Sequence, residues 1–568
     1  MMRLWIAVAL GVVVASGGRT QEGTWAFDYR PDPRKERVLN LRSLNEKVAG
    51  ETGFIRQSED GNDFLRGDGK PIRFWAVSCG ASTDEKLAQA GPWLSSLGVN
   101  MVRICSSKEA SAMLNPKGKT ADPTQPDPRA VDKIQRMTAR LKAHGIYTMI
   151  TCYWVAKGSD TTNWGIEGYT GKSGGMNGLW GLLFFNEKLQ AAYKNWLKVL
   201  LTSRNPYTGI PLAQDPAVGM IMLQNEDTLL FWTVSKMKEP QKRILGKQFG
   251  DWAAKRYGSL DAARKAWDGQ ELKGDDPEAG VLDFYHIWDA TQDQTGGKEK
   301  RINDQIRFWT ETMHSFNKEM VRYLREDLGC KQLIIPENFK TASQSRLLDA
   351  ERWCYSPAEV VAKNHYFSSV HMAARWKTRI NKGDYYTRRS ALHEPRALPV
   401  NMKQHVGHPH MVTESTWVCP NRYLSEGPFL TSAYMSLSGL DGFVWFASGA
   451  GYDNTLARGV RKWMVAQPMI AGMFPANALL YRKGYLQQAR AVIHEERTLD
   501  DVLSRKLPLI CEESGFDVVR DEGSGEKVSK ALRINPLAFL VGRVEVVFDG
   551  DPAKTAIMDL SGQIDDNT

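Results

Sequence analysis

The sequence predicts an α/β protein built as a (β/α)8 TIM barrel, with an N-terminal β-hairpin and a small C-terminal β-rich appendage. Eight short apolar runs follow one another, and most are separated by segments with the spacing of amphipathic helices. Strands that alternate with helices form a parallel sheet, and eight such units close into a barrel. No glycine-rich phosphate loop follows the first run, which counts against a doubly wound open sheet.

The strands are predicted in chain order from their apolar composition. Turn segments EDGND and GDGKP separate short apolar runs near the start and predict the hairpin. The first barrel strand is expected at Ile72–Val77. The other seven are expected at VNMVRI (99–104), IYTMITCYW (146–154), AVGMIMLQNED (217–227), KQLIIPEN (331–338), VVAKNHYF (360–367), PHMVTES (409–415) and DGFVWFAS (441–448).

Helices are predicted between these strands from capping residues and apolar spacing. Thr83 is a suitable N-cap for a helix that runs to Leu97 and ends before Gly98. A long helix is expected over Ile302–Leu328, where apolar residues recur on one face. A helix-rich insert, FGDWAAKRYGSLDAARKAWDG, follows the fourth strand, either as a cover for the site or as scaffold.

The chain divides into three predicted parts. Residues 1–20 are expected to be a signal peptide, residues 21–480 the barrel with its hairpin, and residues 481–568 the appendage. In the last part AVIHEER, RVEVVFDG and AIMDLSG have the character of short strands. The chain stops soon after the last of them, which is compatible with an incomplete appendage.

The first residues carry the features of an export signal. Arg3 precedes an apolar run from Leu4 to Ala15, and small residues follow as far as Gly18. This run is short for a membrane span, and a buried N-terminal helix is the alternative. No later segment reaches 18 unbroken apolar residues. We therefore expect a secreted or periplasmic protein that has no membrane contact after cleavage.

Charge and cysteine usage exclude several classes of protein. The formal net charge is +9 over 568 residues, and no run of five Lys or Arg residues occurs, so a nucleic-acid partner is not predicted. The seven cysteines are scattered without a Cys-x-x-Cys pair, so a zinc ribbon is not predicted. The mild positive charge fits a solvated surface, although an anionic polysaccharide would also suit it.

Two carboxylates stand at the carboxyl ends of predicted barrel strands, where barrel active sites lie. Glu226 ends the fourth strand, directly after Asn225, and Glu414 ends the seventh. Alone, either could be a rim carboxylate paired with Arg or Lys. Together they fit glycoside hydrolysis, in which one carboxyl group protonates the leaving oxygen and the other attacks the anomeric carbon.

These motifs resemble clan A of the glycoside hydrolases, which includes family 5 cellulase-like and family 42 β-galactosidase-like enzymes. The resemblance covers about residues 53–480. It implies that Glu226 is the acid/base and Glu414 the nucleophile of a retaining enzyme. Five further residues match substrate-binding or supporting positions of the clan: Arg103, Asn225, His365, Tyr366 and Trp445. The resemblance implies that Arg103 and the Tyr366 hydroxyl contact the nucleophile and that Trp445 forms a sugar platform. The third strand ends in TCYW instead of the His of many family 5 members.

The predicted function is therefore a retaining glycoside hydrolase that cleaves β-glycosidic bonds in a poly- or oligosaccharide. This mechanism requires no metal or organic cofactor. A carbohydrate-binding barrel without activity is the first alternative. A metallohydrolase that uses His405, His408 and His410 is the second, but Pro409 argues against a helical metal motif there. The sequence does not identify the sugar.

Overall fold

A computed structural model describes residues 39–105, 125–155, 159–173, 178–367, 371–372, 380, 383–386, 388–451, 461–513 and 532–564. The predicted signal peptide lies outside these ranges. Within them, no helix combines the length and the apolar character that a membrane span requires.

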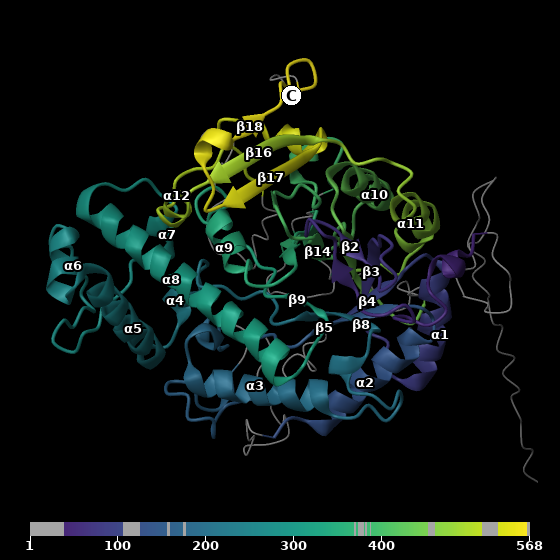
Figure 1. The fold of residues 1–568 in the computed structure, drawn as a ribbon, viewed down its shortest axis with the longest axis horizontal. Coiled ribbons are helices and arrows are strands. Elements are labelled where there is room, and N and C mark those ends of the chain that lie inside the picture. The colour runs from purple at the N-terminus through teal and green to yellow at the C-terminus, as the bar shows by residue number, and fades with distance from the viewer. Residues whose placement is uncertain are drawn as a thin grey trace, which may run out of the picture.

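Eight parallel strands form the centre of the molecule, in the order β10-β14-β15-β3-β4-β5-β8-β9 (Figure 1). Their bounds are β3 Phe74–Cys79, β4 Met101–Ile104, β5 Tyr147–Thr151, β8 Val218–Met222, β9 Leu333–Ile335, β10 Val361–Asn364, β14 His410–Ser415 and β15 Gly442–Ser448. Two backbone hydrogen bonds join the edge strands: Val360 N–H donates to Ile334 O at 3.1 Å, and Asn364 N–H donates to Asn338 O at 2.7 Å. The sheet is thus a nearly closed barrel, and all eight predicted strands are confirmed.

The barrel strands are apolar on both faces because both faces are buried. One face fills the barrel interior, with Ala76 and Met149 among its side chains. The other face packs against the surrounding helices, with Trp75 and Val77 among its side chains.

Helices surround the barrel (Figure 1). Their bounds are α1 Asp84–Ser96, α2 Pro128–Lys142, α3 Glu187–Thr202, α4 Thr233–Lys236, α5 Glu239–Tyr257, α6 Leu260–Ala266, α7 Ile287–Ala290, α8 Gly296–Arg322, α9 Leu348–Cys354, α10 Glu426–Ser438, α11 Phe474–Arg482 and α12 Leu499–Leu503. Thr83 caps α1 as predicted, because its side chain accepts the N–H of Lys86.

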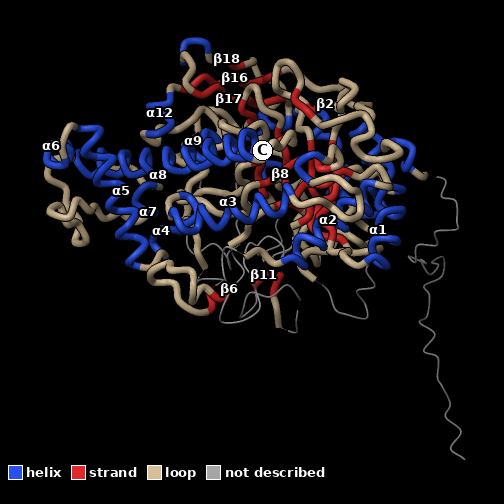
Figure 2. Tube along the Cα trace, turned by 60° about the horizontal axis from the view of Figure 1, so that its bottom comes forward, coloured by secondary structure: helices blue, strands red, loops and turns tan. Residues whose placement is uncertain are grey.

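The insert after the fourth barrel strand contains α5 and α6. These two helices project to one side of the barrel and lie alongside α8 (Figures 1 and 2). Phe249 of α5 stacks on Phe308 of α8 with ring centroids 5.2 Å apart. The insert is therefore helical as predicted and packs on the outer helix layer.

The predicted hairpin is present as β1 Arg56–Gln57 and β2 Phe64–Leu65, paired antiparallel. Two further short pairs, β6 Ser159–Asp160 with β7 Lys172–Ser173 and β11 His371–Met372 with β12 Tyr385–Tyr386, belong to loops that follow barrel strands. Figure 2 places β6 and β11 together at one end of the barrel.

The C-terminal strands form a separate four-stranded sheet in the order β13-β17-β16-β18. Their bounds are β13 Gln404–His405, β16 Ala491–Arg497, β17 Arg543–Phe548 and β18 Ala556–Ile557. Strand β13 immediately precedes barrel strand β14 and pairs with β17 of the C-terminal sheet. This backbone pairing joins the sheet to the barrel. Buried ion pairs reinforce this junction: Asp349 of α9 binds both Lys403 at 2.8 Å and Arg497 of β16 at 2.7 Å.

Candidate active site

Glu226 follows β8 and has a left-handed backbone conformation, with φ of 53°. A residue with a Cβ adopts this conformation only when its surroundings hold it there. The backbone N–H of Glu226 donates to Asn338 Oδ1 at 3.0 Å. Its carboxylate Oε1 accepts from Asn364 Nδ2 at 3.0 Å. The side chain is thus anchored at both ends while 6% of the residue surface remains exposed.

Glu414 lies near the carboxyl end of β14 and is 8% exposed. Its Oε2 accepts from Arg103 Nη1 at 2.9 Å. Its Oε1 accepts from the Tyr366 hydroxyl at 2.5 Å. A cation on one oxygen and a hydroxyl donor on the other both favour the ionised carboxylate.

Arg103 is the central cation of the site and is fully buried. Besides Glu414, its guanidinium binds Thr151 Oγ1, Thr413 O and Asn225 Oδ1. Burial by itself would lower the pKa of Arg103, but Cys105 and the carboxylates of Glu414 and Glu226 outweigh it and raise this pKa. The Arg103 side chain is therefore a permanent cation.

Asn364 connects the two glutamates. It is the register partner of Glu414 in the β10–β14 ladder, and neighbouring strands lie about 4.8 Å apart. Its Nδ2 donates to Glu226, and its Oδ1 accepts from the Thr413 hydroxyl at 3.0 Å. Both carboxylates thus lie at the same end of the barrel, on either side of one amide.

Asn225 belongs to the same network and is 2% exposed. Its Oδ1 accepts from Arg103 and from Asn338 Nδ2, the latter at 3.1 Å. Within the described residues, Asn225 Nδ2 has no hydrogen-bond partner. The two bonds to Oδ1 therefore fix the amide and leave its N–H₂ group available to a ligand.

His365 and Tyr366, two of the predicted substrate-binding or supporting residues, have different positions relative to Glu414. Tyr366 contacts Glu414 as described. His365 is buried, and its backbone N–H donates to Glu414 O at 3.1 Å. Burial, together with nearby Lys363 and Lys340, lowers the pKa of His365 well below its usual value. His365 is therefore a neutral imidazole.

Trp445 does not occupy the predicted position of a sugar platform. It is fully buried on the outer face of β15, where it packs against Trp75 at 5.6 Å and Phe474 of α11 at 5.4 Å. The following residue, Phe446, is the one that faces the site, because its ring meets Tyr366 edge-on at 6.4 Å. Trp463 lies 6.2 Å from Tyr366 and is partly exposed, so this tryptophan lies beside a residue that contacts Glu414.

Glu337 and Asn338, at the end of β9, support the Glu226 loop and were not among the predicted site residues. Glu337 Oε1 accepts the N–H of Asp227, and its Oε2 accepts the N–H of Asn338, both at 2.6 Å. Asn338 in turn binds Glu226 and Asn225. The sequence does contain a signal for Glu337, because this residue also follows an apolar strand, KQLIIP, as Glu226 and Glu414 follow theirs.

Three buried carboxyl groups lie next to this loop. Burial raises the pKa of Glu337 well above its usual value. Burial also raises the pKa of Asp227 and of Glu351 to about 7 each. Each accepts hydrogen bonds from neutral groups, and the Glu351 oxygens bind the hydroxyls of Thr228 and Tyr355. This cluster therefore keeps its protons to higher pH than ordinary carboxyl groups.

The three histidines of the metallohydrolase alternative lie at the other end of β14. His410 begins this strand, and Glu414 lies four residues further on, about 13 Å away along the strand. Both ring nitrogens of His410 meet backbone groups, His408 O at 2.8 Å and His405 N–H at 2.9 Å. The described residues contain no group of three or more His, Cys, Asp or Glu placed to hold a metal ion.

The geometry defines a class of site: two carboxyl groups at the carboxyl end of a (β/α)8 barrel, one bound to arginine and tyrosine and one bound to a neutral amide. No protein-family model matches the chain, and no curated protein matches its sequence.

Several solved structures of glycoside hydrolases are similar to this chain. Gan42B, a GH42 β-galactosidase, is similar with a TM-score of 0.52 and 12% identity over 84% of this chain and 65% of that one. The β-galactosidase from Bacillus circulans sp. alkalophilus has a TM-score of 0.47 and 13% identity over 76% of this chain and 60% of that one. The endo-1,4-β-mannanase from Rhizomucor miehei has a TM-score of 0.39 and 12% identity over 75% and 99%. At these identities the similarity concerns the fold alone, and the similarity to Gan42B agrees with the predicted (β/α)8 barrel and its resemblance to clan A.

Proposed function

We propose that this protein is a retaining glycoside hydrolase that cleaves β-glycosidic bonds in a poly- or oligosaccharide. The observation that carries the proposal is the unequal environment of two carboxyl groups at one barrel end. Glu414 is bound by a buried guanidinium and a phenol. Glu226 accepts from the amide of Asn364. Paired carboxyl groups in different environments take different acid and base roles.

In the first step, Glu226 gives its proton to the glycosidic oxygen while a Glu414 oxygen attacks the anomeric carbon. The bond from that carbon to the leaving oxygen breaks, and a glycosyl ester of Glu414 forms. In the second step, Glu226 takes a proton from water, which attacks the same carbon and releases Glu414 as a carboxylate. Each step inverts the anomeric centre, so the product retains the configuration of the substrate.

Three neighbours support these steps. Arg103 keeps Glu414 ionised before attack and compensates the charge again when the ester breaks. Tyr366 orients the same carboxylate through its hydroxyl. Asn225 has the free N–H₂ group needed to bind the sugar 2-hydroxyl, a contact that strengthens in the oxocarbenium-like transition state.

The decisive experiment combines substitution with product analysis. The purified protein is screened on a panel of β-linked polysaccharides and aryl glycosides, and NMR follows the anomer that forms first on the best substrate. We expect retention, and loss of turnover in both Glu226→Gln and Glu414→Gln. Glu326→Gln, an exposed substitution on the outer surface, is the matched control and should keep full activity.

The alternatives predict other results. Initial formation of the inverted anomer would refute the nucleophile role of Glu414. Saturable oligosaccharide binding without turnover of any substrate would favour the carbohydrate-binding barrel instead.

We also propose that the protein is exported, on the basis of the leader sequence. N-terminal sequencing of the mature protein from the medium or the periplasm should place the first residue shortly after Ala15. An intact N-terminus on cytoplasmic protein would refute export.

A further inference from the structure

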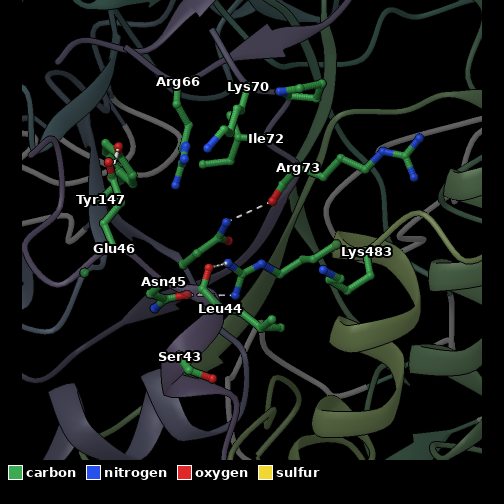
Figure 3. Close-up of a pocket in the computed structure, with 14 residues that line it drawn as sticks. Ser43, Leu44, Asn45, Glu46, Arg66, Lys70, Ile72, Arg73, Tyr147 and Lys483 are labelled. Atoms are coloured by element: carbon green, nitrogen blue, oxygen red, sulfur yellow. Dashed lines mark hydrogen bonds between the residues drawn. The ribbon is translucent and has the colours of Figure 1, made fainter. Parts of the chain in front are cut away.

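A pocket lies at the amino-terminal end of the barrel, at the opposite end of the strands from Glu226 and Glu414. Its volume is about 280 Å³. Residues around the starts of β3, β4 and β5 form one wall, and the N-terminal segment and the end of α11 form another (Figure 3). The lining consists of Ser43, Leu44, Asn45, Glu46, Arg66, Lys70, Pro71, Ile72, Arg73, Asn100, Gly145, Tyr147, Arg482 and Lys483.

The lining is strongly cationic, with five Arg or Lys residues and a single carboxylate, that of Glu46. Neutral donors already satisfy this carboxylate. Its Oε1 accepts from the Thr52 hydroxyl at 2.6 Å, and its Oε2 accepts from Gly50 N–H at 3.2 Å and from the Tyr147 hydroxyl. Glu46 therefore forms no ion pair with the pocket cations among the described residues.

Arg482 is the key cation because its acceptors are all neutral. Its Nη1 donates to Asn45 Oδ1 and Gly98 O, both at 2.8 Å, and its Nη2 donates to Leu44 O at 2.9 Å. A guanidinium has five N–H donors, so Nε–H and one Nη2–H have no partner among the described residues. Burial lowers the pKa of Arg482 to about 9. An anion beside this group would favour its charged form.

Further cations line the same space. Arg66 and Lys70 reach into the pocket from one side (Figure 3). They share one carboxylate, Asp68, at 2.6 and 3.6 Å. Lys483 is exposed and has no ion pair within the described residues. The Arg73 guanidinium turns away and packs 5.5 Å over the Tyr481 ring, so it contributes charge but no direct donor.

We propose that this pocket binds a phosphate or sulfate group, either as the free ion or as the monoester of a molecule the size of a monosaccharide. Such a tetrahedral anion has enough oxygens to accept from the guanidinium of Arg482 and from both lysines at once, as charge-assisted bonds require. The volume approaches that of sites for small organic ligands. Exposed Ser43, Lys70 and Lys483 leave the pocket open to solvent.

This site does not depend on the proposed glycosidase activity. It uses no residue of the catalytic end. Calorimetric binding can therefore succeed or fail whether or not the enzyme assignment holds.

The test is isothermal titration calorimetry on the full chain at constant ionic strength. The probes are inorganic phosphate, sulfate, glucose 6-phosphate and, as a neutral control, glucose. We expect saturable one-to-one binding of the anions, with Kd on the order of 1 mM or tighter, and none of glucose. Tighter binding of glucose 6-phosphate than of phosphate would assign a sugar monoester, and equal binding would assign the free ion.

Two matched double variants locate the site. Lys70→Ala/Lys483→Ala should raise Kd at least tenfold. Lys273→Ala/Lys554→Ala removes the same charge from exposed positions outside the pocket and should leave Kd unchanged. Arg482→Lys, checked for folding by circular dichroism, should also weaken binding by at least tenfold. No saturable anion binding by the wild type, or equal weakening in both double variants, would overturn the proposal.

Discussion

Arg103 Nη1 and Glu414 Oε2 form a 2.9 Å ion pair in which the guanidinium side chain is fully buried and the carboxylate side chain is 10% exposed. The arginine comes from β4 and the glutamate from β14, so the pair crosses the barrel end. Two charges in such a place depend on each other, because removing one leaves the other buried without compensation. This dependence makes the pair a sensitive probe of both stability and catalysis.

Replacing Arg103 by Lys should lower kcat/KM by at least about 100-fold, since an ammonium cannot bind Glu414, Asn225 and Thr151 in one fork. The acidic limb of the pH–rate profile should also move to higher pH, because ionised Glu414 loses part of its stabilisation. Steady-state kinetics over pH would measure both effects.

Arg301→Lys is the matched control for that substitution. Arg301 is equally buried and pairs with Asp275 at 2.6 Å, but it belongs to α8. It should lose stability without a shift in the pH–rate profile. The same shift in both variants would contradict the role of Arg103.

Glu337→Gln should reduce kcat by about 10- to 100-fold with a smaller change in KM. The substitution places an amide N–H₂ against a backbone N–H, so the loop that carries Glu226 moves, and small displacements of a catalytic group are costly. Glu359→Gln is the control, because Glu359 also accepts a backbone N–H, from Ile334 at 2.9 Å, but lies on the amino-terminal side of the barrel. Equal losses of kcat in both variants would show that Glu337 is merely structural.

The sequence predicted the eight strands, and it placed Glu226 and Glu414 at the carboxyl ends of two of them, because long apolar runs and acidic strand ends are local signals. It assigned the sugar contact to Trp445, but the next residue, Phe446, is the one that faces the site. A strand buried on both faces has no polar alternation, so the pattern FVWFA does not reveal which side chains point inward. The roles of Asn338 and Asn364 depend on contacts between β8, β9, β10 and β14, and such contacts between distant segments have no local signature.

The different roles expected of buried Trp445 and partly exposed Trp463 can be tested with one variant of each. Trp445→Phe should lower the free energy of unfolding by about 1–3 kcal/mol, because it opens space in a packed aromatic cluster, and should leave KM unchanged. Trp463→Ala should raise KM severalfold with a smaller loss of stability. Urea denaturation and steady-state kinetics separate the two effects. The reverse pattern would restore Trp445 as the substrate contact.

Asp227→Asn should change how stability depends on pH. The pKa of Asp227 is about 7 in the folded protein against an ordinary 3.8, so the folded state binds its proton more tightly than the unfolded state does. The resulting stabilisation is complete below pH 3.8 and is lost as the pH rises through 7. The asparagine side chain does not titrate, and it keeps an acceptor for the Gly181 N–H that Asp227 binds at 2.8 Å.

Between pH 5 and 8 the variant should therefore gain about 2–3 kcal/mol relative to the wild type, at about 1.4 kcal/mol per pH unit below pH 7. Urea denaturation at each pH gives the difference. Asp60→Asn is the control, because hydrogen bonds from Ser58 and Asn62 lower the pKa of Asp60 to about 2. The stabilisation of Asp60 is lost only when the pH falls towards 2, so its curve should run parallel to the wild type above pH 5. A parallel curve for Asp227→Asn would show that Asp227 is ionised in the folded protein, and the buried carboxyl cluster behind Glu226 would then need a cation that the described contacts do not supply.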